Sequence, residues 1–168
     1  LIIDNSPDIC AHLAEYLREQ GFDPDTSTDG ANGIALMEKS FYDIVLTDLN
    51  MPGIDGMGVL RYVLEHTPES ICTVITGYGT IKNAVEAIKL GAFDYLTKPL
   101  KLEEILISIK RALDHRSLRR ENINLKNQLK RKYRFENIIG DSEKMQKVFE
   151  TIEKVADSDS TILILGGS

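Results

Sequence analysis

The sequence lacks the long apolar runs, clustered cysteines and N-terminal targeting signals that mark several classes of protein. No stretch approaches the roughly 18 consecutive apolar residues of a membrane-spanning helix, so we expect no membrane partner. Cys10 and Cys72 lie far apart without metal-ligand spacing, and no signal peptide or twin-arginine stretch precedes the first apolar run. We therefore expect a reducing, cytoplasmic location. Because Leu1 begins the chain in mid-strand, we also expect a fragment of a longer protein.

Charge of one sign does not dominate the whole chain, but it does dominate one segment. The net charge of −6 argues against a nucleic-acid binder overall. Residues 110–136 nevertheless carry ten of the twenty Lys and Arg against three acids, a net of +7 that leaves −13 for the remainder. This segment therefore has to be interpreted separately from the rest.

The first hundred residues alternate short β-branched runs with helical patterns. Strands are expected at 1–4, 22–26, 42–47, 71–75 and 93–96. Helices are expected after the caps Ser6 and Asp29 and at 58–66 and 80–90. Strands separated by single helices pair in parallel through right-handed crossovers. The pattern predicts an α/β fold, a doubly wound five-stranded parallel sheet for which we take the strand order 2-1-3-4-5.

A longer helical pattern runs from about 102 to 132. One heptad register places Leu118 and Leu125 at d and Asn122 and Leu129 at a, which suits a parallel two-stranded coiled coil. The register covers barely two heptads, and a solvated basic helix remains the alternative. Beyond it, Ser142 can cap a helix over 143–155, and a strand is expected at 161–165.

Polar residues stand where the expected strands end. These are Asp4 and Asn5 after the first strand, Asp48 after the third, Thr76 after the fourth and Lys98 after the fifth. Ligands of such sheets bind beyond the carboxyl ends of the strands, and clustered oxygens suit a divalent cation. Each residue alone could be an ordinary cap or surface group, but five on one rim predict a site for Mg²⁺ and phosphate.

Residues 1 to about 113 resemble the receiver domain of two-component response regulators. The matching strings are LIIDNSPDI, DIVLTDLNMPGIDGM, VITGYG and GAFDYLTKPL, in order and with 28 residues from Asp48 to Thr76 and 22 from Thr76 to Lys98. The resemblance implies that Asp48 accepts a phosphoryl group from a cognate histidine kinase. It also implies that Thr76 and Lys98 contact that group and that Tyr95 is the switch aromatic.

The resemblance further implies a Mg²⁺ site made by Asp4, Asn5, Asp48 and the backbone carbonyl of Asn50. Here the chain departs from the family, which has two acids where this sequence has Asp4 and Asn5. Loss of one negative charge should weaken metal binding. Either phosphorylation is retained, which we favour because Asp48, Thr76 and Lys98 are present, or the domain is a degenerate pseudo-receiver that acts by binding alone.

The last segment, ENIIGDSEKMQKVFETIEKVADSDSTILILGGS, resembles the start of the AAA+ ATPase domain of NtrC-type activators of sigma-54-dependent transcription. The chain ends at Gly166-Gly167-Ser168, before the lysine that a phosphate-binding loop needs. We therefore expect a receiver at 1–113, a helical linker at 114–136 and a truncated ATPase start at 137–168 that does not bind ATP productively.

The predicted function is a regulatory phospho-acceptor, not an enzyme acting on other substrates. Phosphorylation would control a homodimer formed through the linker and the face of the fourth helix, fifth strand and fifth helix. Sigma-54 RNA polymerase and DNA would be partners only of the full-length protein. An aspartate-nucleophile phosphatase is the enzymatic alternative, but its usual second acid is Asn50 here. A flavodoxin-like carrier would need a phosphate-cradling loop after the first strand, which the sequence does not show.

Overall fold

The computed structural model describes residues 1–77, 81–132 and 142–156. The chain divides into two compact units, one over 1–122 and the other over 123–168. The units are described separately. None of the described helices is long and apolar enough to cross a membrane.

The first unit contains a five-stranded, all-parallel sheet with the order β2-β1-β3-β4-β5. Its strands are β1 (Ile2–Ile3), β2 (Thr26–Ser27), β3 (Ile44–Asp48), β4 (Ile71–Thr76) and β5 (Asp94–Thr97). The central strands β3 and β4 are almost wholly buried, as their β-branched runs predict. The predicted doubly wound sheet and its strand order are confirmed.

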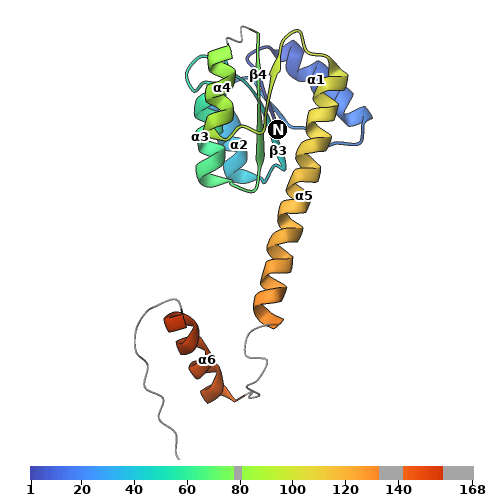
Figure 1. The fold of residues 1–168 in the computed structure, drawn as a ribbon. Helices are drawn as coiled ribbons and strands as arrows, with labels where there is room; N and C mark the ends of the chain where they lie inside the picture. Colours follow the sequence, from blue (N-terminus) through green and yellow to red (C-terminus); the bar gives the residue numbers. More distant parts are fainter. Residues whose placement is uncertain (78–80, 133–141, 157–168) are drawn as a thin grey trace, which may run out of the picture. The chain divides into compact units, whose positions relative to one another are not determined.

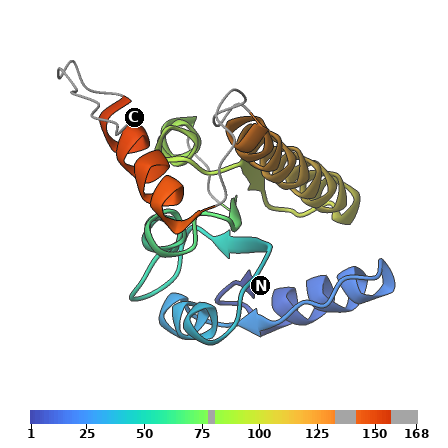
Figure 2. The ribbon, with the colours of Figure 1, turned by 90° about the horizontal axis from the view of Figure 1, so that it is seen from below.

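Helices cover both faces of this sheet (Figure 1). They are α1 (Pro7–Glu19), α2 (Gly30–Lys39), α3 (Gly56–His66), α4 (Ile81–Leu90) and the long α5 (Leu102–Lys132). Seen from below, α1 and α5 lie on one face and α2, α3 and α4 on the other (Figure 2). Each face has its own apolar core, one around Ile2, Leu46 and Ile75 and the other around Ile3 and Val45. The rim of the sheet is thereby held on a well-packed scaffold.

The helix starts follow the capping rules, with one difference from the expected bounds. The Ser6 and Asp29 side chains accept hydrogen bonds from Ile9 N and Asn32 N, as predicted. The third helix begins at Gly56, two residues before the expected start, because Asp55 Oδ1 accepts a hydrogen bond from the Gly58 amide at 2.8 Å. Glycine has poor helix propensity, so the sequence pattern did not indicate that the helix already begins at Gly56.

The second strand also lies later than the expected 22–26. Gly21 has φ 86°, the Phe22 amide donates to Leu17 O, and the Gly21 amide donates to Arg18 O. These two bonds form a Schellman motif that ends α1. Phe22 therefore belongs to the end of the helix, where it packs on the core that includes Leu17, and its β propensity is overridden.

Helix α5 continues without a break past residues 113 and 122. Leu118, Ile123 and Leu125 are at least half exposed on it, while the side chain of Leu129 lies outside the described residues. In the second unit, α6 (Glu143–Ala156) begins where Ser142 Oγ accepts a hydrogen bond from Met145 N at 3.3 Å. The expected strand at 161–165 and the final Gly-Gly-Ser also lie outside the described residues.

Candidate functional site

Three of the predicted site residues meet at the carboxyl ends of three strands. Lys98 Nζ lies 2.6 Å from Asp4 Oδ2 and 3.1 Å from Asp48 Oδ1. Asp4 directly follows β1, Asp48 ends β3, and Lys98 directly follows β5. Because β1 and β3 are neighbours, the two carboxylates are brought to one point of the rim, where the order of the strands reverses. The ammonium group bridges the two acids.

Burial sets the electrostatics of this cluster. Asp4 and Asp48 are only 1% and 3% exposed. Burial raises the pKa of Asp48, and the charge of Asp4 raises it further. Lys98 and the hydrogen bond from the Asn50 backbone amide lower this pKa, but they do not cancel the increase. Partial burial lowers the pKa of Lys98, but the two acids outweigh that effect and raise it. Lys98 therefore stays protonated near neutral pH and faces both acids with a full charge.

The fully buried Thr76 ends β4, the strand that pairs with β3. Its Oγ1 accepts a long hydrogen bond of 3.4 Å from Asn50 Nδ2. The sequence interpretation assigned Asn50 only through its backbone carbonyl, so this side-chain contact was missed. Because the Thr76 hydroxyl oxygen is the acceptor in this hydrogen bond, its proton remains available for a different acceptor.

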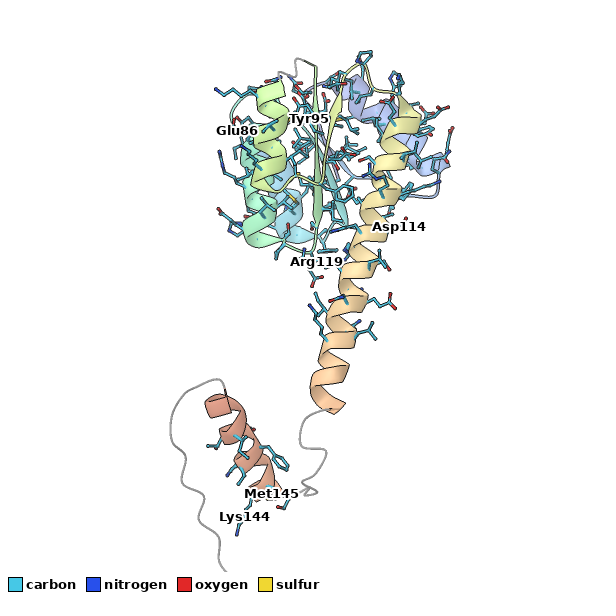
Figure 3. The ribbon with its side chains drawn as sticks, in the orientation of Figure 1. Glu86, Tyr95, Asp114, Arg119, Lys144 and Met145 are labelled. Carbon is cyan, nitrogen blue, oxygen red and sulfur yellow. The ribbon has the colours of Figure 1, made fainter. Side chains whose placement is uncertain are left out.

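Asn5 and Tyr95 do not join the cluster of Asp4, Asp48 and Lys98 in the described structure. Asn5 is exposed, and among the described residues no hydrogen bond or ion pair joins its side chain to Asp4, Asp48 or Lys98. Tyr95, labelled in Figure 3, lies on β5 and packs against the core shared with α2, α3 and α4. Its hydroxyl is buried and has no hydrogen-bond partner within the described part of the chain.

The donor set fits a hard divalent cation. Asp4 Oδ2 and Asp48 Oδ1 are buried and, within the described ranges, accept no well-aligned hydrogen bond beyond their ion pairs with Lys98. Carboxylate oxygens with spare capacity are the ligands that Mg²⁺ prefers, and it needs only one or two of them. Within the described residues, no group of three or more His, Cys, Asp or Glu could hold a metal ion, and the two acids at this rim are Asp4 and Asp48.

Backbone groups support the site in ways that residue types alone did not indicate. The Ser6 amide donates to Asp4 Oδ1 at 2.9 Å, which fixes one oxygen of that carboxylate. Gly56 packs directly against the backbone at the end of β3, since a Cβ there would lie 2.3 Å from the Asp48 carbonyl oxygen and 2.8 Å from Leu49 Cα. Such closeness requires glycine.

Gly56→Ala should therefore lower the free energy of unfolding by about 3 kcal/mol, because the atoms that the new methyl meets are backbone and cannot move aside. Gly58→Ala is the matched control on the same helix. Its Cβ would be 2.9 Å from Ile54 Cγ2, a methyl group of an exposed side chain that can rotate away, so we expect a change of under about 1 kcal/mol. Urea denaturation of both variants measures the difference, and equal losses would contradict the close packing.

The sequence is similar to a known domain family and to curated proteins that contain it. The model of the response regulator receiver domain matches residues 1–110. A putative NtrX-like response regulator of Rickettsia bellii is 34% identical over 168 residues, covering 99% of this chain and 34% of that protein. The chain thus spans about a third of the length of this curated relative.

Solved structures agree with this result. NtrX from Brucella abortus has a TM-score of 0.71 and 29% identity, covering 95% of this chain and 35% of that one. The beryllofluoride-activated NtrC4 receiver domain dimer has a TM-score of 0.65 and 33% identity, covering 68% and 95%. The chain therefore belongs to the response regulator receiver domain family, and its receiver is of the NtrC type.

Proposed function

We propose that this receiver accepts a phosphoryl group on Asp48 from a cognate histidine kinase. The observation that carries the proposal is the placement of Asp48, buried at the end of β3, with one carboxylate oxygen 3.1 Å from Lys98 and beside Asp4. An anionic nucleophile and an anionic donor repel each other, and the ammonium group screens that repulsion.

In the proposed step an Asp48 oxygen attacks the phosphorus of a phosphohistidine. The new O–P bond forms as the P–N bond breaks, and the electron pair of that bond stays on the imidazole nitrogen of the donor. Lys98 neutralises the negative charge on the phosphoryl oxygens, and the Thr76 hydroxyl donates to one of them. The product is an acyl phosphate, whose phosphoryl group carries up to two negative charges in place of the single charge of the carboxylate.

Asp4, Asp48, Asn5 and the Asn50 carbonyl are the groups that we propose hold Mg²⁺. When bound, the cation would neutralise part of the negative charge on the phosphoryl and carboxylate oxygens. Ser6 holds the Asp4 carboxylate in place through its amide.

We further propose that Thr76 and Tyr95 change position on phosphorylation and thereby alter the α4–β5–α5 face. Movement of the Thr76 hydroxyl toward the phosphoryl group would open space on the α4 side of β5, and Tyr95 already packs on that side. The exposed apolar side chains of α4 and of the first turns of α5 include Val85, Ile88, Leu102 and Ile107. Their exposure supports a homodimer through the α4–β5–α5 face, as does the dimer of the related NtrC4 receiver domain.

The rest of the chain is assigned on the same basis. We propose a receiver over 1–113, a helical linker over 114–136 that adds to the dimer through Leu118 and Leu125, and the start of an AAA+ ATPase domain over 137–168. In the full-length protein, phosphorylation would then control a sigma-54-dependent activator, with RNA polymerase and DNA as its partners. The 168-residue chain itself should bind no specific DNA site.

The test of the proposal is phosphoryl uptake from acetyl phosphate, followed by intact-protein mass. With Mg²⁺ we expect a species heavier by one phosphoryl group, and with chelator we expect it to fall by at least about tenfold. An unchanged mass with Mg²⁺ would favour the second candidate, a pseudo-receiver that acts by binding alone. Two observations favour this candidate: the Asn5 side chain is exposed, and no third acid joins Asp4 and Asp48 among the residues that the structure describes.

Asn5→Asp distinguishes the two candidates further. A third carboxylate at the rim should tighten Mg²⁺ binding by about tenfold, because affinity in such sites rises with the number of charged ligands. The measurement is a Mg²⁺ titration of the acetyl phosphate reaction. Asn124→Asp, at an exposed position on α5, is the control and should leave the Mg²⁺ dependence unchanged. Equal Mg²⁺ dependence in wild type and Asn5→Asp would show that residue 5 does not face the cation.

A further inference from the structure

The beginning of the basic segment is attached to the receiver at the end opposite Asp48. Arg116 of α5 makes three kinds of contact there. It forms an ion pair with Asp43 Oδ1, its Nε donates to the Glu69 carbonyl at 3.0 Å, and its guanidinium lies 5.1 Å from the centre of the Phe41 ring. One turn later, Arg119 Nη1 donates to the Pro68 carbonyl at 3.4 Å.

These partners belong to two loops that lead into the strands of the site. Phe41 and Asp43 precede β3, and Pro68 and Glu69 precede β4. The loops are joined to each other, because the Ile71 amide donates to the Asp43 carbonyl at 3.0 Å. Arg119, labelled in Figure 3, lies near these amino-terminal ends of the strands. The far ends of the same two strands carry Asp48 and Thr76.

An isolated surface ion pair contributes only about 0–1 kcal/mol, so the ion pair with Asp43 alone would mean little. Arg116 differs because its planar group is shared by a carboxylate, a carbonyl and an aromatic face, a combination that lysine cannot reproduce. Its side chain is 22% exposed. Arg120, one turn beyond on the same helix, is exposed and has no such contact with the described residues.

We propose that Arg116 is a clasp that fixes residues 113–122 of α5 to the loops before β3 and β4. This stretch of helix then moves with the receiver, and a change at the phosphorylation rim is passed through the two strands to the linker. The inference rests on the proposed function, which supplies the change to be transmitted. Such coupling requires a part of the structure with two arrangements, whose balance is shifted both by the phosphorylation rim and by the linker. In the proposal this part is β3 and β4 with the loops that Arg116 holds.

Arg116→Ala, Arg116→Lys and the control Arg120→Ala test the clasp in the whole 168-residue chain. Hydrogen exchange of residues 113–122 should be about tenfold faster in Arg116→Ala than in wild type, since local opening then costs less. Arg116→Lys should exchange nearly as fast, because it keeps the charge without the planar contacts. Arg120→Ala should match wild type. Equal exchange in Arg116→Ala and Arg120→Ala would overturn the clasp.

Coupling is measured with beryllofluoride and Mg²⁺ as the phosphoryl mimic. In wild type, we expect the mimic to change the dimer dissociation constant by about 10- to 100-fold in analytical ultracentrifugation. In Arg116→Ala, the mimic should still bind within about twofold of the wild-type affinity and change that constant less than about threefold. A full response in Arg116→Ala would overturn the coupling, and so would a wild type that binds the mimic without changing its oligomeric state.

Failure of the proposed function is distinguishable from failure of the clasp. If wild type binds no beryllofluoride, phosphorylation at Asp48 and the coupling are both overturned. The exchange of residues 113–122 still decides whether Arg116 holds the helix.

Discussion

Asp48→Asn is expected to abolish phosphoryl uptake and, in the same variant, to raise the free energy of unfolding by about 1 kcal/mol. An amide oxygen is not a nucleophile that can form a stable acyl phosphate, so no covalent product should accumulate. The gain in stability has a different cause. Asp48 is a buried carboxylate whose pKa is raised, first by burial and then by the charge of Asp4.

Removing that charge relieves the repulsion and leaves Lys98 paired with Asp4 at 2.6 Å. The site thus gives up stability for reactivity, as functional sites often do. Acetyl phosphate labelling and urea denaturation measure the two effects. Asp23→Asn, an exposed acid far along the chain, is the control and should change neither. Normal labelling of Asp48→Asn would mean that the phosphoryl group goes elsewhere.

Lys98→Met should slow phosphorylation by about 10²- to 10³-fold, the usual cost of losing one preorganised charge donor at a developing anion. The matched control is Lys101→Met. Lys101 lies three residues further along, is exposed, and pairs only with Glu104 at 2.8 Å among the described residues. Its loss should leave the rate unchanged. The measurement is the phosphorylation rate of each variant at fixed concentrations of acetyl phosphate and Mg²⁺. Equal slowing in both variants would show that loss of any positive charge has this effect, and not a specific role of Lys98.

Lys98→Met also has a pH signature. Lys98 lowers the pKa of Asp48, so its removal should let burial and Asp4 raise that pKa further. In the folded state Asp48 already binds a proton more readily than its ordinary pKa of 3.8 implies. Its contribution to stability therefore falls as pH rises from 3.8 through the folded pKa, and in the variant this loss extends to higher pH. Carbon NMR titration of the Asp48 carboxyl without Mg²⁺ measures the shift.

The raised pKa of Lys98 acts at the other end of the pH range. Its ion pairs stabilise the fold fully below its ordinary pKa of 10.5 and are lost as pH rises through the higher folded value. Lys98→Met should lack this alkaline loss of stability.

The sequence predicts the sheet well because its signals are strong and local. The run from Ile44 to Leu46 has to be buried on both faces, and single helices between strands allow only parallel pairing. The second strand was placed too early because Phe22 has high β propensity, yet its amide completes the end of α1. Local propensity could not reveal which of the two structures holds that residue.

The site was predicted as a set of strand ends, and the structure brings Asp4, Asp48 and Lys98 together. The supporting contacts were not predictable in this way. The hydrogen bond from Asn50 Nδ2 to Thr76 depends on the path of a loop, and the contacts of Arg116 join residues far apart in sequence. No spacing rule reports such pairs. An arginine in a basic helix resembles its solvated neighbours until its partners are seen.

The most direct test of the central claim is to locate the phosphoryl group. The chain is treated with acetyl phosphate and Mg²⁺, and borohydride then reduces the acyl phosphate to the corresponding alcohol before peptide mapping by mass spectrometry. We predict homoserine at position 48, and at no other aspartate. Reduction at Asp4, or no reduced aspartate in a sample that has gained a phosphoryl group, would contradict the assignment of Asp48 as the acceptor.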